Sequence, residues 1–239
     1  MNQHREETRP VTTLAEQTRE VLESFLSSLP EDEQKTVTSS FAKLLESDVA
    51  DQAIQTGDQA PDFSLPAADG GLRQLSSLLE NGPVVLSFYR GGWCPFCNLE
   101  FRALMEHLPQ IRAAGGSLIG ISPETPDTSR ATVEKHQLEF EVLSDSGNHT
   151  ARDYGLVMTV YEEMRPLYLE WGLDIPAANG DQSWDLPVPA TYVIDTNRIV
   201  RAAFVERDYT RRMEPVDIVS ALRELAPGHE LLTPGKSPR

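Results

Sequence analysis

Apolar residues in the first fifty positions recur at the spacing typical of helices that bury one face. A first stripe, which Pro30 ends, is formed by Val11, Leu14, Val21, Leu22, Phe25 and Leu29. A second stripe follows acidic residues 31–33, which favour a helix N-terminus, and is formed by Val37, Phe41, Leu44, Leu45 and Val49. The pattern predicts an α-helical hairpin. Because two helices cannot bury both stripes by themselves, we expect the hairpin to dock on the rest of the chain or on a second copy, which leaves a homodimer open.

From residue 56 the pattern changes to short apolar runs that alternate with helical stretches. Residues 84–89 and 117–122 predict buried strands, and stretches near 94–113, 127–138 and 147–154 predict helices. Residues 190–195 and 199–206 flank a polar turn and predict an antiparallel hairpin, after which residues 215–226 predict a closing helix. This alternation predicts an α/β fold with helices on both faces of a central sheet.

We therefore divide the chain into an N-terminal helical extension (1–55), an α/β domain (56–226) and a C-terminal tail (227–239) that we expect to be loose. Within the domain, residues 156–187 form a long connection. Its part 161–171 predicts a short helix with an apolar side, and 172–187 is expected to be irregular. Long segments of this kind are often lids or binding loops, and a simple cover over apolar surface is an equally open interpretation.

The charge of the chain excludes several classes of partner. With 21 Lys and Arg against 37 Asp and Glu, the net charge is −16 at pH 7. Binding to nucleic acids or to anionic membranes depends on clustered positive charge, so neither is an expected partner. The N-terminus lacks the apolar stretch of an export signal, and no apolar run approaches the ~20 residues of a membrane span. We expect a cytoplasmic protein, in which structural disulfides are uncommon.

The two cysteines, Cys94 and Cys97, form a C-x-x-C pair between the most apolar strand and a helix. They begin a helical stripe that continues through Phe101, Leu104, Leu108 and Ile111, which places both sulfurs on one face, one turn apart. At a helix N-terminus, unpaired N–H groups and the helix dipole favour a thiolate at Cys94. Arg90 would add positive potential there, unless it is merely solvated. The pattern predicts a redox-active dithiol.

Other roles for the pair are less well supported. A zinc site needs two more Cys or His ligands, and the remaining histidines have no paired spacing. Covalent haem needs His directly after the second Cys, where this chain has Asn98. Two cysteines buried as small core residues remain an alternative. We expect no metal and no cofactor.

Residues 88–97, Phe-Tyr-Arg-Gly-Gly-Trp-Cys-Pro-Phe-Cys, resemble the active-site segment of the thioredoxin superfamily. More widely, residues 57–226 resemble the peroxiredoxins, also called the alkyl hydroperoxide reductase and thiol-specific antioxidant (AhpC/TSA) family. The matching segments are Ala60-Pro61-Asp62-Phe63-Ser64-Leu65, Gly120-Ile121-Ser122-Pro123-Glu124, Leu143-Ser144-Asp145, Tyr154-Gly155 and Ala190-Thr191-Tyr192-Val193-Ile194-Asp195. The resemblance implies a thioredoxin-like fold with a central mixed sheet flanked by helices; the N-terminal hairpin lies outside it.

The peroxiredoxin motif, Pro followed after three residues by Thr and after two more by Cys, falls on Arg90, Cys94 and Cys97. Cys97 thus corresponds to the peroxidatic cysteine, while Arg90 and Cys94 replace the Pro and the Thr. The arginine that family members carry before the later strand is replaced by Pro189, which resembles the cis-proline of thioredoxins. We therefore expect a cis bond between Val188 and Pro189.

The resemblance implies an antioxidant thiol peroxidase that reduces hydrogen peroxide or organic hydroperoxides. In this reaction the Cys97 thiolate attacks the peroxide, Cys94 condenses with the resulting sulfenic acid, and a reductant of the thioredoxin or glutathione type restores the pair. The first alternative is a protein dithiol-disulfide oxidoreductase, in which Cys94, at the exposed helix end, attacks a partner disulfide. The second is a non-enzymatic redox sensor or adapter whose disulfide moves residues 156–187.

Four further residues complete the expected site: Arg90, Trp93, Pro95 and Pro189 are expected to contact the substrate or a partner. Glu100 lies one turn after Cys97, where it could relay protons, but a solvated helical Glu is the commoner case.

Overall fold

A five-stranded mixed sheet forms the centre of the computed structural model, which describes residues 12–225. Its strand order is β5 (Glu141–Ser144), β4 (Ser117–Ser122), β3 (Val84–Phe88), β8 (Ala190–Ile194) and β9 (Val200–Val205). The first three strands are parallel, whereas β8 runs antiparallel to both β3 and β9. All five residues of β3 are buried. The predicted α/β fold with a mixed central sheet is confirmed.

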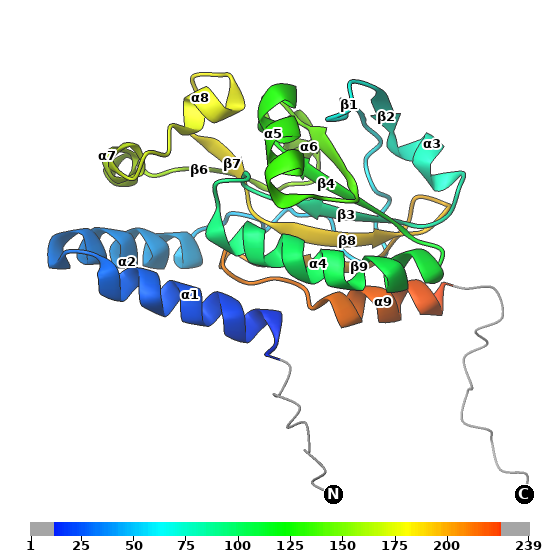
Figure 1. Cartoon of the computed structure of the whole chain (residues 1–239), viewed down its shortest axis with the longest axis horizontal. Helices are drawn as coiled ribbons and strands as arrows, with labels where there is room; N and C mark the ends of the chain where they lie inside the picture. Colours follow the sequence, from blue (N-terminus) through cyan, green and yellow to red (C-terminus); the bar gives the residue numbers. More distant parts are fainter. Residues whose placement is uncertain (1–11, 226–239) are drawn as a thin grey trace, which may run out of the picture.

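Helices cover both faces of the sheet (Figure 1). On one face α4 (Pro95–Ala113) and α9 (Pro215–Glu224) lie side by side and share an apolar core with Val85, and α5 (Pro126–His136) follows on that face. The other face packs against α6 (His149–Asp153), α3 (Leu75–Leu79) and the hairpin of β1 (Ser64–Pro66) and β2 (Leu72–Gln74). Successive residues of β3 enter these two cores in turn, because strand side chains alternate between faces. The helix α4 begins at the end of the sheet where β3 ends.

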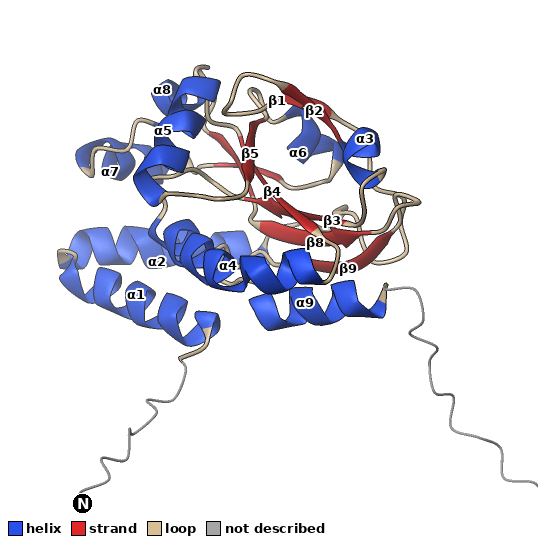
Figure 2. Ribbon diagram, turned by 45° about the vertical axis from the view of Figure 1, so that its right-hand side comes forward, coloured by secondary structure: helices blue, strands red, loops and turns tan. Residues whose placement is uncertain are grey.

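The N-terminal hairpin consists of α1 (Leu14–Ser28) and α2 (Glu31–Glu46), close to the predicted bounds. It docks on its own chain: α1 lies along α4, as Figure 2 shows, and α2 contacts the 3₁₀ turn at 162–164 that follows β6. The Glu214 carboxylate accepts hydrogen bonds from the backbone N–H groups of Leu14 (3.2 Å) and Ala15 (2.9 Å). These groups have no partner within α1, so the loop before α9 caps the first helix.

Residues 156–187 form a compact layer over α2. The segment contains β6 (Val157–Thr159), a 3₁₀ turn η1 (Glu162–Met164), α7 (Arg165–Glu170), α8 (Ile175–Asn179) and β7 (Asp185–Pro187), with β6 and β7 antiparallel. The predicted helix within 161–171 is confirmed. The expectation that 172–187 is irregular is wrong, because the Asp174 side chain caps α8 and Gly180, at φ +69°, ends it.

The bond between Val188 and Pro189 is trans, so the expected cis-proline is wrong; residues 12–225 contain no cis peptide bond. The chain runs extended from β7 into β8, and the Val188 N–H donates to the Leu156 carbonyl at 2.7 Å, which fixes this course. The predicted C-terminal tail lies outside the described residues. Among the helices of residues 12–225, none combines the length and the apolar character needed to cross a bilayer.

Candidate active site

The two cysteines lie at the junction between β3 and α4. Cys94 is the N-cap residue of α4, Pro95 occupies its first turn, and Cys97 follows one turn later. Both are free thiols and neither is exposed to solvent. The prediction of one shared face is confirmed in that both cysteines are buried in the same apolar cluster, together with Phe101 and Leu104 of α4. The expectation that Cys94 lies at an exposed helix end is wrong, because the hairpin α1–α2 and residues 156–187 close over it.

Arg212, from the loop between β9 and α9, reaches the inner sulfur. Its Nη2 donates to Cys97 Sγ at 3.2 Å, and its Nε is ion-paired with Glu100. Ser87 on β3 donates to the other Glu100 oxygen at 3.1 Å. Glu100 is only 2% exposed, so the expectation of a solvated side chain is wrong. Its place in the apolar stripe of α4 was a signal for a buried counter-ion, whereas nothing local marked Arg212.

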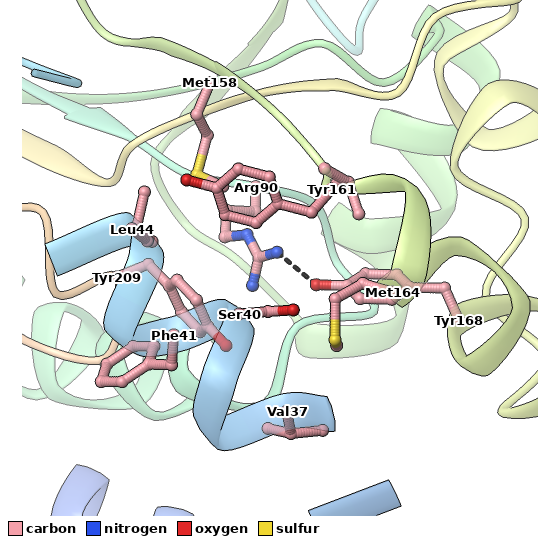
Figure 3. A pocket seen from close by; sticks show the side chains of 11 residues that line it. Val37, Ser40, Phe41, Leu44, Arg90, Met158, Tyr161, Met164, Tyr168 and Tyr209 are labelled. Carbon is pink, nitrogen blue, oxygen red and sulfur yellow. Dashed lines mark hydrogen bonds between the residues drawn. The ribbon is translucent and has the colours of Figure 1, made fainter. Parts of the chain in front are cut away.

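Arg90 is buried as well, on the side of Cys94. Figure 3 shows its guanidinium among aromatic and methionine side chains, with a hydrogen bond from Nη2 to the Tyr168 hydroxyl at 2.6 Å. The guanidinium carbon lies 4.2 Å from the ring centroid of Tyr209 and 5.2 Å from that of Trp93. No carboxylate within residues 12–225 forms an ion pair with Arg90. The expectation of a solvated Arg90 is therefore excluded, and its charge acts on the thiols.

The surroundings of the two thiols favour one negative charge on the pair. Burial disfavours a thiolate, but the hydrogen bond from Cys97 and the charges of Arg90 and Arg212 outweigh it and lower the pKa of Cys94 to about 5. Burial, the hydrogen bond with Cys94 and the Cys94 charge raise the pKa of Cys97 well above its ordinary value. The Arg212 contact draws part of the charge to Cys97, so the pair is best described as two sulfurs that share one proton.

A second buried carboxylate, Glu124, holds the loop that leads to Cys94. Both of its oxygens accept from the Gly92 N–H at 3.1 Å, and burial raises its pKa to about 7. Position 92 requires glycine, since a Cβ there would lie 2.2 Å from Thr132 Oγ1. In the sequence, Glu124 stands out only as part of a segment that matches the family, and no local pattern indicates its contact with Gly92.

A cavity of about 140 Å³ leads to Cys94. Three of the four expected contact residues, Arg90, Trp93 and Pro95, line it, and the hairpin and residues 156–187 supply its other walls. Cys97 and Pro189 are both buried, and neither lines the cavity. Among residues 12–225, no group of three His, Cys, Asp or Glu side chains is placed to hold a metal ion.

Comparisons with known proteins place this site in a family. A family model described as AhpC/TSA family matches residues 56–203. A putative peroxiredoxin of Mycobacterium tuberculosis is 33% identical over 117 residues, which cover 48% of this chain and 74% of the relative. The chloroplastic peroxiredoxin Q of Populus jackii is 29% identical over 151 residues, which cover 63% of this chain and 60% of the relative.

Solved structures agree on the fold. The crystal structure of peroxidoxin BcpB from Mycobacterium tuberculosis superposes with a TM-score of 0.57 at 25% identity and covers 72% of this chain and 99% of that one. Peroxiredoxin Q of Xanthomonas campestris shares the fold with a TM-score of 0.53 at 16% identity, over 67% of this chain and 89% of that one. Because the family model alone spans more than half of the 239 residues, the chain belongs to the AhpC/TSA family, the peroxiredoxins of the thioredoxin superfamily.

Proposed function

We propose that this protein is a thiol peroxidase that reduces a small hydroperoxide through a Cys94/Cys97 dithiol-disulfide cycle. The observation that carries the proposal is that the dithiol is closed to the protein surface and is reached through a cavity of about 140 Å³ that ends at Cys94. A protein disulfide cannot enter a space of this size, whereas a hydroperoxide can. Its peroxiredoxin relatives support the same assignment.

The cavity also argues for an order of attack. The family motif gives the first attack to Cys97, but Cys94 is the sulfur in the cavity wall and the one whose thiolate Arg90 supports. In the proposed reaction the Cys94 thiolate attacks the nearer peroxide oxygen, the O–O bond breaks, and Cys94 becomes a sulfenic acid. The alkoxide that leaves takes the proton of the Cys97 thiol and departs as an alcohol.

The second step closes the disulfide. The Cys97 thiolate, now stabilised by Arg212, attacks the sulfenic sulfur of Cys94 and expels hydroxide. The pair has lost two electrons to the peroxide, and an external dithiol must return them.

Sulfenic acid trapping tests both the reaction and the order. Each single variant, Cys94→Ser and Cys97→Ser, is treated with one equivalent of hydroperoxide in the presence of a dimedone probe. We expect rapid labelling of Cys94 in Cys97→Ser and slow labelling of Cys97 in Cys94→Ser. The reverse result would restore the family order and keep the peroxidase.

A third outcome would remove the peroxidase assignment. If neither variant forms a sulfenic acid, but Cys97→Ser accumulates mixed disulfides with oxidised insulin chains through Cys94, the protein is a disulfide oxidoreductase. The double variant Cys94→Ser/Cys97→Ser is the control for unspecific labelling.

A further inference from the structure

Arg90 is a buried cation that lacks an acidic partner. Arg90 is 3% exposed. The ionisable groups whose charges act on its guanidinium are Tyr168, Cys94 and Tyr209. The first and last are phenols and not carboxylates. The Cys94 thiolate is therefore the negative charge that balances Arg90 in the dithiol form.

Arg212 does not change this balance. Its own charge is matched by Glu100, with which it forms an ion pair that is buried on both sides. Two positive charges, Arg90 and Arg212, thus face the Glu100 carboxylate and one thiolate. The other buried carboxyl group nearby, Glu124, has its pKa raised to about 7 by burial, accepts from the Gly92 N–H and forms no ion pair with either arginine. When Cys94 and Cys97 form a disulfide, the thiolate disappears and Arg90 keeps its charge. A buried charge without a counter-ion is strongly unfavourable.

From this imbalance we infer a redox-gated ligand site: in the disulfide form, the cavity beside Arg90 binds a small amphipathic monocarboxylate. The carboxylate replaces the lost thiolate as the counter-ion of Arg90, and the apolar part of the ligand fills the cavity. In the dithiol form the same ligand meets a thiolate and binds weakly.

The cavity walls define the class of ligand. Two residues that line the cavity, Arg90 and Trp93, each carry a buried donor, Nε and Nε1, that has no acceptor among the described residues. The remaining walls are almost entirely apolar and include Phe25, Trp171 and Leu173. The volume of about 140 Å³ is close to the ~150 Å³ that admits benzene in engineered cavities. One negative charge and one ring-sized apolar group therefore match the site.

A smaller cavity on the other side of Arg90 belongs to the same cluster. Figure 3 shows this space, in which Met158, Tyr161 and Leu44 surround the guanidinium without any acidic side chain. Its volume is only about 30 Å³, so it does not hold an organic ligand. The anion must approach from the side of Cys94.

The inference requires the disulfide but not a particular oxidant. The test therefore uses diamide, rather than peroxide, to prepare the disulfide form and dithiothreitol to prepare the dithiol form. Phenylacetate and phenylacetamide, which differ in charge and scarcely in shape, are titrated into each form, and the fluorescence of Trp93 and Trp171 reports binding. We expect the disulfide form to bind phenylacetate at least tenfold more tightly than phenylacetamide, and tenfold more tightly than the dithiol form does.

Linkage provides a second measurement. A ligand that binds the disulfide form tenfold more tightly must stabilise that form, which makes the midpoint potential of the pair about 30 mV more negative at saturation. Arg90→Met should abolish the preference for phenylacetate while phenylacetamide still binds. Arg130→Met, which removes an exposed arginine of α5, is the charge-matched control and should behave like the wild type.

Several results would overturn the inference. Equal affinity for the two ligands, or equal affinity of the two redox forms for phenylacetate, would show that Arg90 needs no external counter-ion. If sodium chloride at the same ionic strength shifts the midpoint potential as much as phenylacetate does, any anion can balance Arg90. The assignment of the ligand as an amphipathic monocarboxylate would then be wrong. A protein that diamide oxidises but that fails to reduce hydroperoxide would contradict the proposed function and leave this inference intact.

Discussion

The chemistry of the site depends on how single side chains are charged. Cys94 stands at the N-cap of α4, where helix N–H groups favour an anion, and Arg90 and Arg212 approach it from opposite elements. Burial acts against the thiolate, but the hydrogen bond from Cys97 and the charges of Arg90 and Arg212 together outweigh it and lower the pKa of Cys94. The surroundings of the dithiol thereby favour a thiolate although both cysteines are buried.

The ionisation of Cys94 gives a prediction for pH dependence. Because its pKa is lowered to about 5, the thiolate should form as the pH rises through 5, and the protein should lose it below that value. In Arg90→Met the midpoint should move upward by roughly one unit or more, since a nearby opposite charge is lost. The ultraviolet absorbance of the thiolate measures both, with Cys94→Ser/Cys97→Ser as the blank. A midpoint unchanged in Arg90→Met would mean that Arg90 does not support the thiolate.

The ion pair of Arg212 and Glu100 gives a prediction for stability. Both side chains are buried, so Arg212→Met leaves an uncompensated carboxylate and should lower the free energy of unfolding by about 3–5 kcal/mol. Replacing both partners, as in Arg212→Met/Glu100→Gln, should recover much of this loss, because neither of these two positions then holds an uncompensated buried charge. Urea unfolding of the dithiol form measures the three proteins. A double variant as unstable as the single one would mean that Arg212 acts through packing.

At the scale of elements, the site is assembled from loops that a stable sheet holds in place. The loop between β3 and α4 carries the cysteines, the turn between β4 and α5 supplies Glu124, and the loop between β9 and α9 supplies Arg212. Glu214, which lies in the same loop as Arg212, also caps α1. This short loop therefore contacts both the N-terminal hairpin and the sulfur of Cys97. Local patterns predicted the strands and helices because each follows its own periodicity. They could not predict Arg212, whose position depends on how a distant loop folds.

The same distinction, between features set by neighbouring residues and features set by distant ones, explains the other differences between the structure and the predictions from the sequence. The C-x-x-C pair and its helix follow from residues that are neighbours in the chain. The burial of Cys94 does not, because its cover comes from residues before 47 and after 156. The Val188–Pro189 bond was expected to be cis by analogy with thioredoxins, but it is trans, because an analogy with a family does not determine a local bond geometry.

Glu124 gives a prediction at the scale of its loop. The unfolded chain releases this proton near pH 4.5, whereas the folded protein retains it until about pH 7. The free energy of unfolding should therefore fall by about 3 kcal/mol as the pH rises through that window. Glu124→Gln keeps an acceptor for the Gly92 N–H and should remove this part of the pH dependence. Urea unfolding across the window, with Glu134→Gln on the exposed side of α5 as control, measures it; identical pH profiles for wild type and Glu124→Gln would contradict the assignment.

On the scale of the whole molecule, the N-terminal hairpin and residues 156–187 form one cover over the cavity. Phe25 of α1 packs edge-to-face on Trp171 with ring centroids 5.3 Å apart, and Trp171 Nε1 donates to Glu33 of α2 at 3.2 Å. In the proposed reaction a small hydroperoxide enters beneath this cover, whereas a protein reductant would meet the cover over both buried cysteines. Reduction by a protein dithiol therefore requires the cover to open.

This requirement predicts how the cover controls reduction. Phe25→Ala removes the edge-to-face contact, whose loss of about 1–1.5 kcal/mol should raise the open fraction, and with it the rate of disulfide reduction by thioredoxin, about tenfold. The rate with a small phosphine reductant should change little, because that reagent does not need the wide opening. Phe41→Ala is the matched control: it removes an aromatic side chain from the same hairpin, but one that packs on Tyr209 and does not line the larger cavity. Stopped-flow measurement of both reductants on all three proteins gives the ratio of the two rates. If Phe25→Ala leaves this ratio unchanged, the disulfide form already exposes its sulfurs and the closed cover belongs to the dithiol form alone.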